Sequence, residues 1–146
     1  MLLRALVAVL LWSAVARADP AACVASLSAA RASAARLDST LEKLQVRVDG
    51  KRVVVSGAEC GRIEVEVRAD PRGRSDRPWR AEKRGVALLQ APDENLCGAR
   101  HAEERAHGGY VASVASRAVP PAIVERFKRA VDECIGPSPR AKINRR

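Results

Sequence analysis

The sequence predicts an α+β domain, with a four- to five-stranded antiparallel sheet and an N-terminal and a C-terminal helix packed on one face. Two patterns predict this class. Near both ends of the chain, apolar residues recur every three or four positions, which is the spacing of one helix face. Between them, residues 62–68 (RIEVEVR) alternate between apolar and charged side chains. Such alternation is typical of an antiparallel strand with one face in water.

The first helix is predicted over residues 21–43. Asp19 can accept hydrogen bonds from the free amides of a first turn, and Pro20 suits the first helical position. One face of this helix is expected to be apolar, and it consists of Val24, Leu27, Ala30, Ala34, Leu37, Leu41 and Leu44.

A β-hairpin is predicted next, because residues 45–48 and 52–56 flank an Asp49-Gly50 dipeptide. This dipeptide favours the positive φ angles of a two-residue hairpin turn. If these two residues form the loop, Val46 lies opposite Val53.

Residues 62–68 form the third predicted strand, with Ile63, Val65 and Val67 on the buried face. Residues 70–83 (DPRGRSDRPWRAEK) have the composition of a polar loop. The continuous apolar run within residues 84–90 (RGVALLQ) predicts a fourth strand.

The remaining elements lie between residue 98 and the C-terminus. Residues 98–107 have no clear apolar face, and we expect a short exposed helix or a loop there. Residues 110–117 are predicted as a fifth strand. Pro120-Pro121 then precedes a second helix, which Gly136-Pro137 ends. Its apolar stripe consists of Ile123, Phe127, Ala130, Val131, Cys134 and Ile135.

Residues 1–18 are predicted to be a secretory signal peptide, since Arg4 precedes an apolar run that ends at Ala16-Arg17-Ala18. The domain organisation is then a leader over 1–18, a single domain over 19–136, and a disordered basic tail over 137–146. We expect the mature chain to be exported, periplasmic or extracellular, without a transmembrane segment. A retained anchor and lipidation of Cys23, which follows two alanines, are the alternatives.

Removal of the leader with Arg4 and Arg17 lowers the net charge from +9 to +7, and more than half of this excess is at the C-terminus. The tail carries Arg140, Lys142, Arg145 and Arg146 and no acidic residue, so the domain before it is closer to neutral. Aromatic residues make up only 3% of the chain, which argues against proteins that stack nucleic-acid bases. We therefore expect no nucleic-acid partner.

The four cysteines, Cys23, Cys60, Cys97 and Cys134, are expected to form two disulfides in an oxidising compartment. Three pairings are possible, and the sequence does not decide between them. The order of the predicted strands favours Cys60 with Cys97, because both lie beyond strand ends at one edge of the sheet. Cys23 then pairs with Cys134 and joins the two helices.

The best candidate contact surface is a basic cluster around Trp79. Guanidinium groups bind carboxylates and phosphates bidentately, and an exposed tryptophan can anchor a partner. The cluster consists of Arg72, Arg74, Arg77, Trp79, Arg80, Lys83 and Arg84. In the alternative interpretation, this segment is a solvated loop in which Trp79 folds back onto the sheet.

The favoured function is a non-catalytic, disulfide-stabilised interaction module that binds an unknown envelope protein or an anionic envelope component. We expect no cofactor. One alternative is a small periplasmic enzyme or metal-binding protein that uses Cys97, His101, Glu104 and His107, with Cys97, His101 and His107 as metal ligands. Another is a chain whose basic tail binds anionic lipid or polymer.

Overall fold

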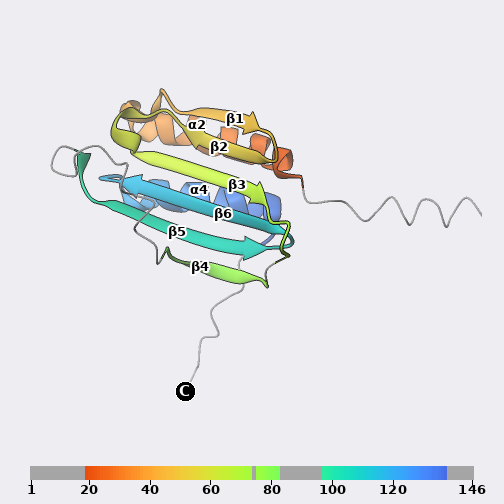
Figure 1. Ribbon diagram of the computed structural model, residues 1–146. Coiled ribbons are helices and arrows are strands. Elements are labelled where there is room, and N and C mark those ends of the chain that lie inside the picture. Colours follow the sequence, from red (N-terminus) through yellow and green to blue (C-terminus); the bar gives the residue numbers. More distant parts are fainter. Residues whose placement is uncertain (1–18, 74, 83–96, 138–146) are drawn as a thin grey trace, which may run out of the picture.

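The computed structural model describes residues 19–73, 75–82 and 97–137. Within these residues, six antiparallel strands form one sheet in the order β1-β2-β3-β6-β5-β4, and two helices lie across one of its faces (Figure 1). The strands are β1 (Gln45–Asp49), β2 (Arg52–Ser56), β3 (Ile63–Ala69), β4 (Arg77–Ala81), β5 (Arg100–His107) and β6 (Tyr110–Arg117). The helices are α2 (Val24–Leu37) and α4 (Pro121–Ile135), with short 3-10 turns η1 (Pro20–Cys23), η2 (Ser39–Leu41) and η3 (Glu59–Gly61). The α+β class is confirmed, and the sheet has more strands than the four to five predicted.

The N-terminal helix is shorter than predicted because Asp38 interrupts it. Asp19 caps the preceding turn η1, where its carboxylate accepts a hydrogen bond from the backbone amide of Ala21 at 3.0 Å. Asp38 has extended backbone angles, and its carboxylate accepts a hydrogen bond from the amide of Thr40 at 3.0 Å. Because this cap starts η2, the chain changes direction before Leu41, which is nevertheless buried.

The first hairpin has a different register from the predicted one. The loop consists of Gly50 and Lys51, and Val46 lies opposite Val55 rather than Val53. Gly50 has φ +59°, so it supplies the left-handed conformation that the turn requires. The sequence pattern identified the turn but placed its loop one residue too early.

The core lies between the sheet and the two helices. β3 and β6 are the central strands. Val65 and Val67 of β3 are buried as predicted, and Ala112 and Val114 of β6 are buried beside them. From the helices, Leu27 and Ala34 of α2 and Ile123, Phe127 and Val131 of α4 complete the same cluster. Burial of each large apolar side chain contributes about 1.5–3 kcal/mol.

Two segments differ in kind from the prediction. Residues expected to be helix or loop form strand β5, and the expected polar loop contains strand β4. β5 lacks apolar alternation because its helix-facing side chains are polar. Two of them, Glu103 and Arg105, have charged partners on α4. The strand predicted over residues 84–90 lies outside the described residues, as do the predicted leader and residues 138–146.

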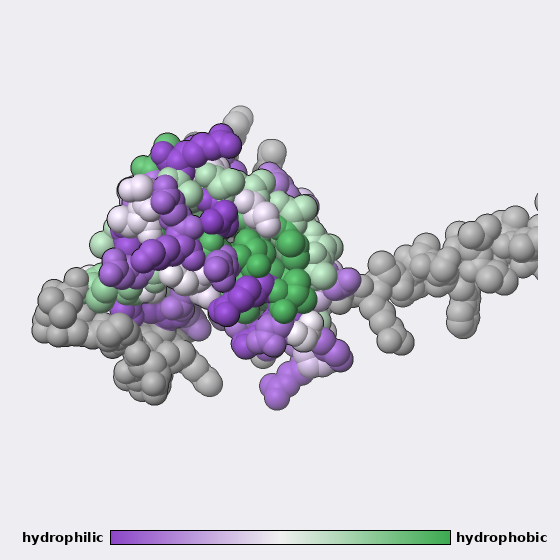
Figure 2. Space-filling view, turned by 90° about the horizontal axis from the view of Figure 1, so that it is seen from above, coloured by the Kyte–Doolittle hydropathy of each residue, from purple (hydrophilic) through white to green (hydrophobic). Residues whose placement is uncertain are grey.

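The edge of the sheet at β1 exposes apolar side chains. Figure 2 views the molecule from this side and shows an apolar patch bordered by hydrophilic residues. Val48 on β1 is 57% exposed, and Leu37 at the end of α2 is 59% exposed. Val24 and Val46, by contrast, are partly buried against the core.

Two disulfides join the predicted cysteine pairs. Cys23 at the end of η1 is bonded to Cys134 on α4, and Cys60 in η3 is bonded to Cys97. The second pair forms for a reason that differs from the predicted one. β3 and β5 are both antiparallel to β6, so both begin at the same end of the sheet. Cys60 precedes β3 and Cys97 precedes β5, which brings the two together.

Candidate functional site

The basic cluster predicted around Trp79 is divided between the two faces of the sheet. Arg77 and Arg80 lie opposite Ala106 and Glu104 of β5, and the irregular pairing between them is a β-bulge. Both arginines are exposed on the face away from the helices, which we call the open face. Arg72 is exposed in the turn before β4. Arg74, Lys83 and Arg84 lie outside the described residues.

Trp79 lies on the opposite, helix-facing side and contacts α4. Its indole Nε1 donates a hydrogen bond to Asp132 Oδ1 at 3.0 Å, and the side chain is only partly exposed. Lys128 Nζ lies 5.6 Å from the centroid of the ring, within range of a cation–π interaction. Trp79 therefore connects the edge strand β4 to α4, which agrees with the alternative interpretation that it folds back onto the sheet. It is not part of the surface that carries Arg77 and Arg80.

The same carboxylate of Asp132 holds a buried arginine. The Arg105 guanidinium is fully buried; its Nη1 forms an ion pair with Asp132 and also donates to the carbonyl of Gly136 at 2.7 Å. Lys128 lies between Glu103 and Glu125, at 3.1 and 3.0 Å. Burial acts to lower the pKa of Lys128, but the hydrogen bonds that it donates to Glu125 and Glu103 outweigh it, and the pKa is raised. These charges stabilise the fold between β5 and α4.

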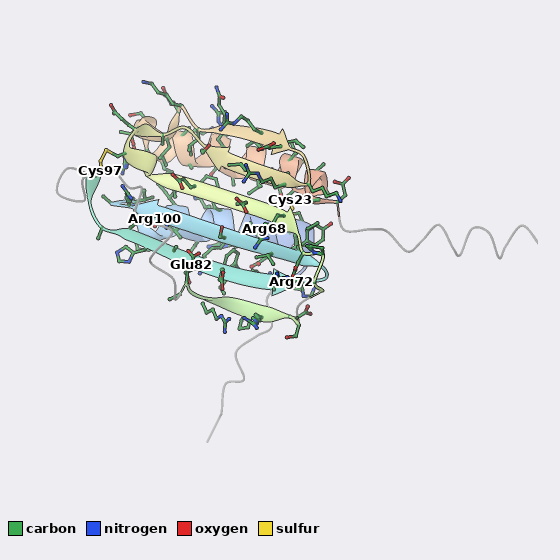
Figure 3. All side chains as sticks on the ribbon, viewed as in Figure 1. Cys23, Arg68, Arg72, Glu82, Cys97 and Arg100 are labelled. Carbon is green, nitrogen blue, oxygen red and sulfur yellow. A yellow bond between two sulfur atoms is a disulfide. The ribbon has the colours of Figure 1, made fainter. Side chains whose placement is uncertain are left out.

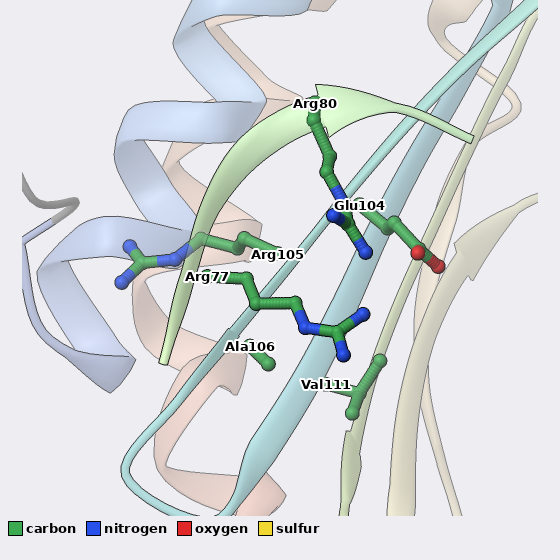
Figure 4. A pocket seen from close by; sticks show the side chains of 6 residues that line it. All are labelled: Arg77, Arg80, Glu104, Arg105, Ala106 and Val111. Carbon is green, nitrogen blue, oxygen red and sulfur yellow. The ribbon is translucent and has the colours of Figure 1, made fainter. Parts of the chain in front are cut away.

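The open face carries a narrow hollow beside β4. Arg77, Arg80, Glu104, Ala106 and Val111 line it, together with Arg105, whose guanidinium points away towards α4 (Figure 4). The side chains of Arg77 and Arg80 extend across the same surface as Glu104. With a volume of about 10 Å³, the hollow admits little more than one water-sized group.

A larger depression of about 290 Å³ lies over the central strands of the open face. Its lining comes from β2, β3, β5 and β6 and consists of Val54, Ser56, Glu64, Val65, Glu66, Arg100, Ser113 and Ala115. The small residues Ser113 and Ala115 on β6 leave this part of the face hollow. Figure 3 shows Arg100 near the start of β5.

Arg100 has an unsatisfied donor in this depression. Its Nη1 is buried and has no hydrogen-bond partner among the described residues. Buried donors without a partner are rare in folded proteins, because leaving one unpaired costs about 1–3 kcal/mol. Arg100 is therefore a residue of this face that lacks an acceptor within the described part of the chain.

The other charges of the open face are partly paired. Arg52 forms ion pairs with Asp49 at 2.7 Å and with Glu66 at 3.4 Å, and Arg68 lies 3.5 Å from Glu66. The hydrogen bond from Arg52 lowers the pKa of Asp49, and Asp49 in turn raises the pKa of Arg52. Within the described part of the chain, Arg77, Arg80 and Arg100 form no such ion pair.

The residues considered for metal binding or catalysis do not converge. Cys97 is in a disulfide, and His101 and His107 are six residues apart on one strand, which separates them by about 20 Å. Glu104 lies on the open face, whereas both histidines lie on the helix-facing side, since side chains alternate along β5. His107 Nδ1 instead lies 2.9 Å from Asp76 Oδ2. No group of three or more metal-ligating side chains occurs within the described ranges.

Arg100, which lines the depression, was not identified from the sequence. It belongs to a segment whose charged composition favoured an exposed helix, so its position beside the serines of β2 and β6 could not be inferred. The signal that could have located it is the Gly108-Gly109 pair, which is typical of a hairpin turn and would have indicated a strand on either side.

Comparison with known proteins adds no further information on the site. No family model, curated protein or solved structure matches the chain. Across the described residues, neither helix has the length and apolar character needed to cross a bilayer.

Proposed function

We propose that this chain is an exported, non-catalytic binding module whose open sheet face binds a carboxylate-bearing segment of a partner protein. The observation that carries the proposal is the buried, unpaired Nη1 of Arg100 in the 290 Å³ depression. A carboxylate in this depression would supply the missing acceptor, and charge-assisted hydrogen bonds of this kind are among the strongest.

Two further arginines support an acidic ligand. Arg77 and Arg80 lie on the same face, and neither has an ion pair in the part of the chain that is described. Their guanidinium groups extend over the sheet near Glu104 (Figure 4). A ligand that crosses the face from Arg100 towards β4 would meet several donors suited to carboxylates.

The acidic residues of the face favour a protein segment over a uniformly anionic polymer or lipid surface. Glu64 lies in the depression with Arg100, and Glu104 lies beside Arg77 and Arg80. A polyanion would be repelled at both positions. A protein segment can place carboxylates opposite the arginines and hydrogen-bond donors opposite the glutamates, which gives specificity in addition to attraction.

Export is supported by the chemistry of the cysteines and by the leader-like N-terminus. All four cysteines are in disulfides, and disulfides persist in oxidising compartments such as the periplasm or the cell exterior. Residues 1–18 have the order of a charged residue, an apolar run and a small-residue cleavage site. Both observations favour a partner outside the cytoplasm.

Site-specific photocrosslinking in the intact cell tests this proposal. A photoreactive amino acid at Ser113 lies in the depression, and one at Ala29 lies on the exposed surface of α2. We expect a discrete crosslinked product from position 113 only, and we expect Arg100→Gln to abolish it. The matched control, Arg36→Gln, removes the same charge from the exposed end of α2 and should leave the product unchanged.

Two results would overturn the proposal. One is equal crosslinking from positions 113 and 29, which indicates no preference for the open face. The other is a product from position 113 that persists in the Arg100→Gln variant, because the unpaired donor is then not used.

A further inference from the structure

The free edge of β1 is a second surface that the proposed function does not use. Among the described strands, β1 is at one end of the sheet and pairs only with β2. In a two-residue hairpin, the residues that flank the loop exchange backbone hydrogen bonds. Along each strand, residues whose backbone groups point towards the partner strand then alternate with residues whose backbone groups point away from it. With Asp49 opposite Arg52, the backbone groups of Val46 and Val48 point away from the sheet.

The two edges of the sheet differ in how they are protected. The edge strand β4 contains Pro78 and a β-bulge, and both features hinder the addition of another strand. β1 has neither feature. Its side chains on the helix-facing side are Val46 and Val48, with Val48 57% exposed, so no charge points inward there.

Arg31 of α2 defines where the free edge begins. It donates hydrogen bonds to the carbonyl of Glu42 at 2.8 Å and to the carbonyl of Leu44. These two carbonyls precede β1, and because Arg31 already donates to them, they are not available to an added strand. Among the described residues, backbone hydrogen bonds also occur in turns, loops and caps. The amides and carbonyls of Val46 and Val48 take part in none of these. The available edge is thus short and matches two alternate residues of an added strand.

The charges around this edge favour an acidic strand. Arg47 is exposed on the open face of β1, and among the described residues its guanidinium donates only to the hydroxyl of Ser56. Lys43 and Lys51 are exposed on either side of it. The nearby carboxylate of Asp49 is already paired with Arg52 at 2.7 Å. An incoming strand with a carboxylate opposite Arg47 would complete the pairing.

A second copy of this chain fits the edge less well. Two copies can satisfy all the outward groups if Val46 of one lies opposite Val48 of the other. This register places Arg47 directly opposite Arg47 of the second copy, and like charges at such a position are destabilising. The charge pattern therefore favours a different protein over self-association.

From these observations, we propose that the β1 edge binds an extended segment of a partner protein as a seventh strand, with apolar and acidic residues alternating along it. Its backbone pairs with Val46 and Val48. Its apolar side chains lie beside the valines on the helix-facing side, over the apolar patch of Figure 2, and an acidic side chain lies opposite Arg47.

Titration with designed peptides, followed by NMR, tests this inference with the disulfide-bonded protein. The probe is a capped seven-residue peptide in which valine alternates with aspartate. We expect it to shift the backbone amide signals of Val46 and Val48 and to leave those of β4 unchanged. A peptide in which lysine replaces aspartate should bind about fivefold to tenfold more weakly.

Charge reversal gives the decisive comparison. The Arg47→Glu variant should invert the preference, so that the lysine peptide binds more tightly than the aspartate peptide. The matched control Arg36→Glu makes the same charge change on α2 and should keep the original preference. An aspartate peptide with N-methyl groups on its valine amides should bind to neither variant, since those amides are the ones that would pair with the edge. The Arg100→Gln variant should bind the peptide normally, because the depression is a separate surface.

Each other outcome contradicts the inference. If Arg47→Glu and Arg36→Glu have the same effect, the attraction depends on net charge and not on the edge. If the N-methylated peptide binds as well as the unmodified one, strand addition does not occur. If the free protein forms a dimer that Arg47→Glu disrupts, the occupant of the edge is a second copy.

Discussion

Replacing Asp132 with asparagine should strongly destabilise the domain. The change keeps the shape of the side chain and an oxygen that can accept the hydrogen bond from Trp79, but it removes the negative charge beside Arg105. The guanidinium of Arg105 is fully buried, so its charge depends on Asp132 and on the carbonyls of Gly136 and Pro137, at 2.7 and 3.3 Å.

The expected loss follows from this environment. Breaking a buried ion pair by removing one partner costs about 3–5 kcal/mol, because the remaining charge stays buried. The Asp132 side chain is 25% exposed, so water partly replaces the lost interaction. We therefore expect the free energy of unfolding to fall by about 3 kcal/mol.

Urea denaturation followed by far-ultraviolet circular dichroism measures this loss, with both disulfides intact. Trp79→Phe removes the indole donor and part of the ring but leaves the ion pair intact, and it should cost about 1 kcal/mol. The double variant Arg105→Met with Asp132→Leu replaces the pair with apolar groups and should recover much of the stability. An Asp132→Asn protein within about 0.5 kcal/mol of the wild type would refute the assigned role, because the buried charge would then not need its partner.

Three further predictions concern the bridges, the end of α4 and the cap of η2. Replacing Cys23 and Cys134 with alanine should lower the free energy of unfolding by about 4.8 kcal/mol in the chain-entropy model, since 111 residues separate them. Removing the bridge that spans 37 residues should cost about 3.8 kcal/mol; the reverse order in thermal or urea denaturation contradicts this account. Gly136→Ala should lower the melting temperature, because Gly136 has φ +113° and a Cβ there would overlap the ring of His107 on β5. Gly73→Ala should lower it less, because a Cβ at Gly73 would lie in open space. Hydrogen bonds, chiefly from the Thr40 hydroxyl, lower the pKa of Asp38 below 3.8, so Asp38 stabilises the fold above that pH and the benefit is lost as pH falls through the lowered pKa. The stability difference between wild type and Asp38→Asn should accordingly narrow between pH 6 and pH 2, and a constant difference rules out this linkage.

The parts of the fold that the sequence predicted are those with a single apolar face. β3 alternates without interruption, and α4 has one apolar stripe bounded by Pro121 and Gly136, so local spacing was sufficient. The prediction for the segment that forms β5 was wrong because Glu103 and Arg105 face the helices, where Lys128 and Asp132 stabilise them. Those partners are more than twenty residues away in the chain, and no local pattern indicates them.

The candidate site was predicted in part for the same reason. The sequence identified Arg77 and Arg80 as binding residues, a role that stays a prediction, but it grouped them with Trp79. The bulge in β4 directs the tryptophan to the other face, and a bulge depends on pairing with β5. Arg100 shares the depression with Ser56 and Glu64 only when the β5–β6 hairpin aligns with β2 and β3, which is a property of the assembled sheet.

The bridge between Cys23 and Cys134 also determines how the domain carries mechanical load. It links a residue before the first long helix to one near the end of the last, and every strand lies within the loop that it closes. A pulling force applied through the chain on both sides of the domain would pass from one cysteine to the other through covalent bonds. The sheet would remain unstretched, so a surface formed across its strands would keep its shape while the chain on either side is under tension.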